Sequence, residues 1–152
     1  MIVCFDVRFE NFSFTDIDQE DLVTSISDPY TISMIDYKGK LGVCNCTIYD
    51  NLLVKLWVLE DAEEHKWSKH IYQTQMPRAA SSISLAGMVS SGEIVLYPCY
   101  GPSNVQEPFF IYYYNLESGI ITRVRLEVPI FKEFSYSRFF IFSDFEEDLT
   151  PI

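Results

Sequence analysis

Four acidic residues and two histidines gather between positions 60 and 70, and these residue types bind metals or move protons. The acids are Glu60, Asp61, Glu63 and Glu64, and the histidines are His65 and His70. A helical zinc pair needs imidazoles four positions apart, so that both lie on one face. His65 and His70 are five apart, and in a strand that spacing directs them to opposite faces. We therefore expect no metal site here and interpret the acids as the solvated turn of a β-hairpin.

Cysteines form a second set of possible ligands. Cys44 and Cys46 are two positions apart, so on a strand both thiols face the same side. No His or Cys partner follows at metal-binding spacing, and neighbouring cysteines on one strand fit disulfide geometry poorly. We interpret them as buried free thiols, and we expect Cys4 and Cys99 to stay reduced as well.

The sequence lacks the motifs of covalent and phosphate chemistry. No serine lies in a Gly-x-Ser-x-Gly elbow, and no glycine-rich phosphate loop is present. An aromatic stripe could recognise a ligand, but we expect it to belong to the core. The stripe comprises Phe109, Phe110, Tyr112, Tyr113 and Tyr114. We predict that the protein is not an enzyme and has no catalytic residue, no metal and no cofactor. The substrate-binding residues are unknown from sequence.

The elements that would position these residues repeat along the chain. A strand–turn–strand pattern occurs three times, at 2–17, 52–72 and 109–127, with turns at Asp6, Glu60 and Asn115. The turns are 54 and 55 positions apart. A further strand precedes the second and third copies, and Gly39 and Gly92 stand at equivalent places in these two units. A repeat of about 50 residues with several strands per unit is typical of kelch-like propellers.

The predicted fold is all-β, a partial kelch-like β-propeller with about three blade-like antiparallel units. We expect one domain over 1–152, with units near 1–17, 31–73 and 83–127 and a terminal strand at 138–145. Residues 52–59 are almost entirely apolar, which predicts a strand buried on both faces, whereas 120–127 alternates and predicts a strand nearer the solvent. Trp57 and Trp67 flank one turn and are expected to be structural.

The composition excludes several classes of partner. Eleven basic and 22 acidic residues give a net charge of −11, which disfavours nucleic acid and anionic membranes. No apolar run is long enough to span a bilayer, and the first residues do not resemble a signal peptide. We therefore expect a location in the cytoplasm or the nucleus.

Several segments resemble the F-box-associated domain of plant F-box proteins, in that family's order along nearly the whole chain. They are YKGKLGV (37–43), KLWVLEDAEEHKWSKHIY (55–72), GEIVLYP (92–98) and YYNLESGIITRVRLE (113–127). The tryptophan–acid–tryptophan block is the most specific part. The resemblance implies a kelch-like propeller that holds the protein substrate of a cullin-based ubiquitin ligase.

In that family an N-terminal helical F-box binds a Skp-type adaptor, and no segment of these 152 residues resembles one. We therefore expect a non-catalytic, protein-binding fragment of an F-box substrate receptor that does not bind the Skp-type adaptor by itself. Two alternatives stay open: a kelch-like interaction module with no role in ubiquitin transfer, and a non-functional truncated copy.

Overall fold

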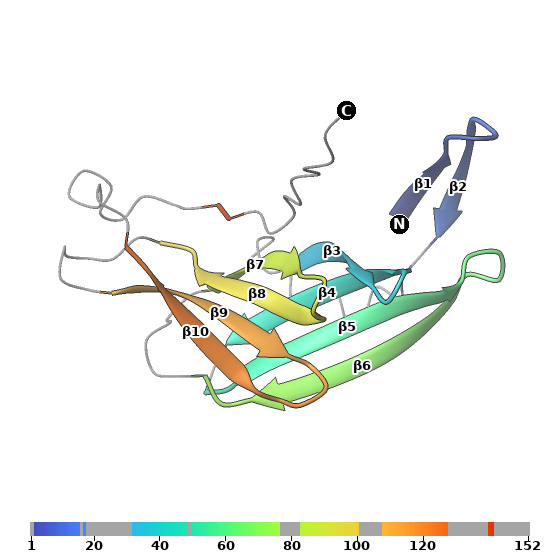
Figure 1. The fold of residues 1–152 in the computed structure, drawn as a ribbon. Coiled ribbons are helices and arrows are strands. Elements are labelled where there is room, and N and C mark those ends of the chain that lie inside the picture. Colours follow the sequence, from blue (N-terminus) through green and yellow to red (C-terminus); the bar gives the residue numbers. More distant parts are fainter. Residues whose placement is uncertain are drawn as a thin grey trace.

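The computed structural model describes residues 2–15, 17, 32–48, 50–76, 83–100, 108–127 and 140–141, which form strands and turns but no helix (Figure 1). The strands are β1 (Ile2–Asp6), β2 (Asn11–Thr15), β3 (Ile32–Tyr37), β4 (Lys40–Ile48), β5 (Leu52–Asp61), β6 (Lys66–Thr74), β7 (Ile83–Met88), β8 (Glu93–Pro98), β9 (Phe109–Asn115) and β10 (Ile121–Leu126). The predicted all-β class is confirmed. Within these residues no helix is long and apolar enough to cross a membrane.

The strands form three antiparallel sheets. β1 and β2 make a two-stranded hairpin, and β3-β4-β5-β6 make the first four-stranded sheet. The second four-stranded sheet has the order β10-β9-β8-β7. In Figure 1 the two larger sheets lie one over the other, and the β1–β2 hairpin projects from them. In each larger sheet, strands that follow one another in the sequence lie side by side and antiparallel, as in the blade of a propeller.

One side-chain turn recurs in all three sheets and explains the periodicity of the sequence. Oδ1 of Asp6 accepts hydrogen bonds from the backbone N–H of Arg8 (2.8 Å) and Phe9 (3.2 Å). Oδ1 of Asn115 accepts in the same way from the residues two and three positions ahead, at 3.1 and 2.9 Å. Short polar side chains favour such turns because they satisfy backbone donors locally.

The equivalent residue in the first four-stranded sheet is Asp61, so the prediction that Glu60 takes this place was wrong by one position. Oδ1 of Asp61 accepts from the N–H of Glu63 (2.9 Å) and Glu64 (3.0 Å). The cause is a β-bulge between Leu59 and Asp61, which inserts one residue into β5 before the turn.

Each turn ends in the left-handed backbone region, four residues after its acceptor. These residues are Glu10 (φ 49°), His65 (φ 52°) and Gly119 (φ 72°). The residue at the end of each turn is therefore set by its backbone conformation. For His65, this conformational role explains its place in the turn without a catalytic or metal-binding role.

The main core lies between the two four-stranded sheets. β5 directs Leu52, Val54, Leu56 and Val58 into it, and β9 directs Tyr112 and Tyr114 into it. These six side chains are buried, as expected for strands that are apolar on both faces. The exposed residues of β10 confirm the prediction of a strand nearer the solvent.

A second, smaller core covers the other face of β5. It contains Trp57, Val43 and Ile17, with Ile2 of β1 and Trp67 of β6 packed against it. The two tryptophans therefore pack in the framework, and Ile2 and Ile17 bring the N-terminal part of the chain onto the first four-stranded sheet.

Two short strands, β3 and β7, are not predicted from the sequence, and most of one predicted strand lies outside the described residues. β3 and β7 form the inner edges of the larger sheets, and they contact each other. Of the predicted strand at 138–145, residues 138–139 and 142–145 lie outside the described residues. Phe140 and Ile141 are described and belong to no strand.

Candidate functional site

The structure places most of the acid-and-histidine cluster at the turn between β5 and β6. Glu63, Glu64 and His65 are exposed in this turn, whereas His70 is half-buried on β6. The two histidines thus belong to different elements. The hairpin interpretation is confirmed.

Ser68 links Glu60 to His70. Its hydroxyl oxygen lies 2.7 Å from Oε1 of Glu60, to which it donates, and 3.1 Å from Nε2 of His70. Lys40 also donates to Glu60, and together with Ser68 it holds the pKa of that carboxyl below its usual range. A general acid needs a raised pKa, so this arrangement suits a structural ion pair rather than proton transfer.

The two neighbouring thiols are buried between the sheets, as predicted. Cys44 and Cys46 have no exposed surface, and their sulfur atoms are 3.9 Å apart. The hydrogen bond between the Cys46 thiol and Cys44, together with burial, raises the pKa of Cys46 well above its usual value. A protonated thiol is a poor nucleophile and a poor metal ligand.

The aromatic stripe of β9 is part of the core, which confirms that prediction. Phe109, Tyr112 and Tyr114 are buried, and Phe110 and Tyr113 are half-buried. Burial raises the pKa of both Tyr112 and Tyr114. The buried rings of Phe109, Tyr112 and Tyr114 are therefore not available to an external ligand.

Removal of metal is expected to leave the stability of the protein unchanged. Among the described residues, no three His, Cys, Asp or Glu side chains come together in a way that could hold an ion. A structural zinc site contributes directly to the free energy of folding, so its loss would be visible. The measurement is thermal unfolding with and without a chelator, and stoichiometric zinc in elemental analysis of the purified protein would contradict this expectation.

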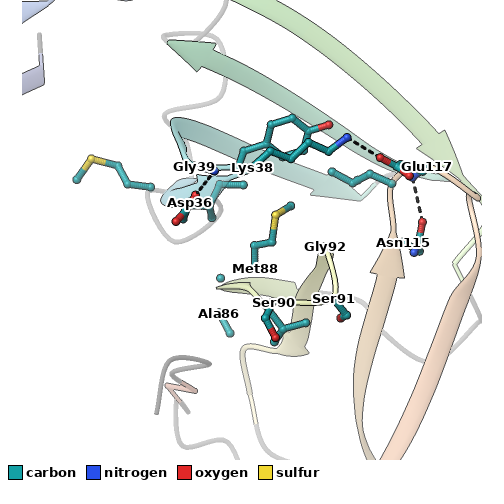
Figure 2. Close-up of a pocket in the computed structure, with 16 residues that line it drawn as sticks. Asp36, Lys38, Gly39, Ala86, Met88, Ser90, Ser91, Gly92, Asn115 and Glu117 are labelled. Atoms are coloured by element: carbon teal, nitrogen blue, oxygen red, sulfur yellow. Dashed lines mark hydrogen bonds and ion pairs between the residues drawn. The ribbon is translucent and has the colours of Figure 1, made fainter. Parts of the chain in front are cut away.

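A groove opens where three turns of the two larger sheets meet, with a volume of about 660 Å³ (Figure 2). The turns join β3 to β4, β7 to β8 and β9 to β10. We call it the rim groove; its polar lining includes Asp36, Lys38, Ser90, Ser91, Asn115 and Glu117. In Figure 2 the side chain of Met88 lies between the first two turns.

Tight turns shape two walls of the rim groove. Oδ1 of Asp36 accepts a hydrogen bond from the N–H of Gly39 (2.8 Å), and Lys38 and Gly39 both have positive φ angles (54° and 78°). Gly92 (φ 83°) donates its N–H to the carbonyl of Val89 (2.8 Å). A Cβ atom at either glycine would meet nothing within 4 Å, so the backbone of both turns is open to a ligand.

One ion pair joins the two sheets across the rim groove. Nζ of Lys38 lies 2.6 Å from Oε1 of Glu117, although the residues are 79 positions apart in the chain. The contact raises the pKa of Lys38 and lowers that of Glu117. Both side chains are largely exposed, so the pair adds little to stability. The pair brings the β3–β4 turn into direct contact with the β9–β10 turn.

We expect the Glu117 carboxyl to titrate below the usual glutamate range, because Lys38 stabilises its charged form. As the pH falls through that lowered pKa, the pair is lost. Carbon-detected NMR of the side-chain carboxyl measures this, and Lys38→Met should return the pKa of Glu117 to the ordinary value. A Glu117 pKa that is the same in both proteins would show that the pair does not form in solution.

The comparison with protein families decides what this fold is. Residues 1–146 match the F-box associated beta propeller domain. The chain belongs to the F-box-associated β-propeller family. The resemblance seen in the sequence is confirmed, and so is its propeller fold. No solved structure matches the chain.

Several F-box proteins of Arabidopsis thaliana are similar to this member of the F-box-associated family. "Putative F-box protein At1g53550" is 52% identical over 159 aligned residues, which cover 99% of this chain and 37% of the relative. "F-box protein DOR" is 38% identical, with 100% of this chain and 37% of the relative covered. The chain therefore spans about a third of the length of the curated relatives it matches.

Sequence reasoning missed the rim groove of this F-box-associated chain, although its parts were visible. Gly39 and Gly92 were recognised as equivalent, and Asn115 was recognised as a turn. What the sequence did not show is that these three turns meet at one end of two packed sheets. Equivalent turns of neighbouring blades lie at the same rim of a propeller. The repeat in the sequence could therefore have predicted that these turns lie close together.

Proposed function

We propose that this chain is part of the substrate-recognition propeller of an F-box-type receptor in a cullin-based ubiquitin ligase, and that its rim groove binds a segment of the protein substrate. The family membership supports a role in F-box proteins. The assignment of the binding site rests on one observation, the groove formed by turns from both larger sheets. Turns on a rigid scaffold are well suited to recognition, because they vary without disturbing the core.

The lining of the rim groove suits an extended peptide. The open space beside Gly39 and Gly92 leaves room for a peptide, and Ser90, Ser91 and Asn115 add polar side chains. Met88 contributes an adaptable apolar contact.

We infer that the role is binding rather than catalysis. Among the described acids, those whose pKa values shift are Glu60, Asp61 and Glu117, and all three are shifted downward, so they stay ionised. The buried thiol of Cys46 is shifted upward and stays protonated. Such groups are stable partners in hydrogen bonds but poor proton donors and nucleophiles at neutral pH.

We also infer that 1–152 belongs to one propeller domain and works in the cytoplasm or the nucleus, where cullin-based ligases act. The Skp-type adaptor is expected to bind an F-box and not these residues. Calorimetric titration of the adaptor into the purified chain should give no heat of binding, whereas micromolar affinity would contradict this.

Affinity capture from plant extract tests the proposed site. The wild-type chain should retain a protein partner that the double variant Lys38→Glu/Ser91→Arg loses, because both changes alter the lining of the rim groove. Arg125→Glu is the matched control, since Arg125 is an exposed residue of β10 outside the groove lining. Equal capture by all three proteins would overturn the assignment of the groove.

A further inference from the structure

The lining of the rim groove carries more negative than positive charge. Its charged residues are Asp36, Lys38 and Glu117, so one lysine stands against two carboxylates. That lysine is already engaged, because its Nζ lies 2.6 Å from Oε1 of Glu117. Asp36 accepts a hydrogen bond from the N–H of Gly39, and no cation among the described residues pairs with its carboxylate. Within this part of the chain, the groove therefore keeps one negative charge that is not compensated.

The turns around the groove are acidic as well. The first and third turns of a four-stranded antiparallel sheet lie at the same end, so the β5–β6 turn lies beside the β3–β4 turn. An ion pair between Lys40 and Glu60 connects the strands that carry these two turns. The four turns of this rim and the residues beside them contain seven acids and three lysines, a net charge of −4. The acids are Asp36, Glu60, Asp61, Glu63, Glu64, Glu93 and Glu117, and the lysines are Lys38, Lys40 and Lys66.

The groove combines an apolar contact with carboxylates from both sheets. Met88 lies between the β3–β4 and β7–β8 turns (Figure 2), and a Cβ atom at Gly39 or Gly92 would meet nothing within 4 Å. Asp36 comes from the first larger sheet and Glu117 from the second. Lysine and arginine side chains pack their methylene stems against apolar groups while the charged end stays hydrated. The groove therefore suits a long side chain with an apolar stem and a positive end.

We propose that the rim groove binds a basic segment of the protein substrate, in which a lysine or arginine donates hydrogen bonds to Asp36 and Glu117. This assignment rests on the proposed function, which places a substrate segment in the groove. Among the described residues, no three His, Cys, Asp or Glu side chains come together to hold a metal ion, so the charge suits a side chain rather than a metal. The net charge of −11 also attracts a basic segment before contact.

The test begins with random decapeptides displayed on phage and selected on the immobilised 152-residue chain. The retained peptides should be enriched in lysine and arginine and depleted in aspartate and glutamate relative to the starting library. Fluorescence polarisation of the labelled peptides then gives their dissociation constants. These constants should rise with ionic strength, because salt screens exposed ion pairs.

Two matched variants separate the groove from the net charge. Asp36→Asn/Glu117→Gln removes two negative charges, and the amide oxygen at position 36 can still accept from Gly39. It should raise the dissociation constants of the selected peptides about tenfold, since two exposed ion pairs are lost. Asp50→Asn/Glu127→Gln removes the same charge from exposed residues at the opposite end of the sheets, in the β4–β5 turn and after β10. This control should bind the peptides like the wild type.

Circular dichroism checks that the variants fold, and Glu117→Gln with Glu127→Gln as its control replaces the double variants if Asp36→Asn prevents folding. Equal weakening by the two double variants would overturn the proposal, because only the net charge would then matter. Peptides that lose binding in Lys38→Glu/Ser91→Arg but show no excess of lysine and arginine would also overturn it, and the groove would remain a binding site. If no selected peptide loses binding in Lys38→Glu/Ser91→Arg, the proposed function of the groove fails as well.

Discussion

Replacing Trp57 with alanine is expected to lower the free energy of unfolding by about 3–5 kcal/mol. Only 4% of the side chain is exposed, and it fills the small core with Val43 and Ile17. Ile2 of β1 packs against the same cluster, so the truncation also removes a contact that holds the hairpin to the first larger sheet. The ammonium group of Lys69 lies 5.7 Å from the ring centroid and loses its cation–π partner.

Urea unfolding followed by circular dichroism measures this change. Ile71→Ala is the control, because Ile71 lies on the adjacent strand β6 with 58% of its surface exposed. Its truncation should alter stability by no more than about 0.5 kcal/mol. Unchanged stability of Trp57→Ala, together with lost partner binding, would mean that Trp57 is a recognition residue and not a core residue.

Gly42→Val is expected to destabilise the protein by about 1–3 kcal/mol through overpacking. Gly42 is a buried residue of β4, next to the main core. A Cβ atom there would lie 3.0 Å from Cγ1 of Ile35 and 3.2 Å from Cδ1 of Leu56. Both neighbours are held in close-packed surroundings, so they have little room to move away.

The double variant Gly42→Val/Ile35→Ala tests whether the cost comes from this contact. Removing the Ile35 side chain makes room for the valine, so the double variant should be more stable than the sum of the two single changes implies. Strictly additive losses would show that the glycine is required for another reason.

Local chemistry explains why the hairpins were predictable from the sequence. The acceptor side chains of Asp6 and Asn115 organise their turns with bonds to residues two and three positions ahead, so the signal lies in one short segment. The strands between turns are marked by aromatic and branched residues. The bulge at Leu59 has no such local mark, which is why the equivalent turn was placed one residue early.

The rim groove depends on contacts between distant parts of the chain. β3 and β7 each pair with the next strand through a tight turn, but they contain polar residues such as Asp36 and Ser84 and contact each other only when the two sheets pack together. The pair of Lys38 and Glu117 joins turns 79 positions apart. No periodicity in a single segment predicts such a pair, although the repeat itself indicated the propeller.

Site-specific photo-crosslinking tests most directly that the rim groove is where this chain holds a protein. A photoreactive amino acid is placed at Ser91, in the groove lining, or at Thr122, an exposed position on β10 outside that lining. After irradiation in plant extract, the chain modified at Ser91 should form a covalent adduct with a discrete protein partner, and the chain modified at Thr122 should not. Adducts from Thr122 alone, or equal adducts from both positions, would show that the rim groove is not the binding site.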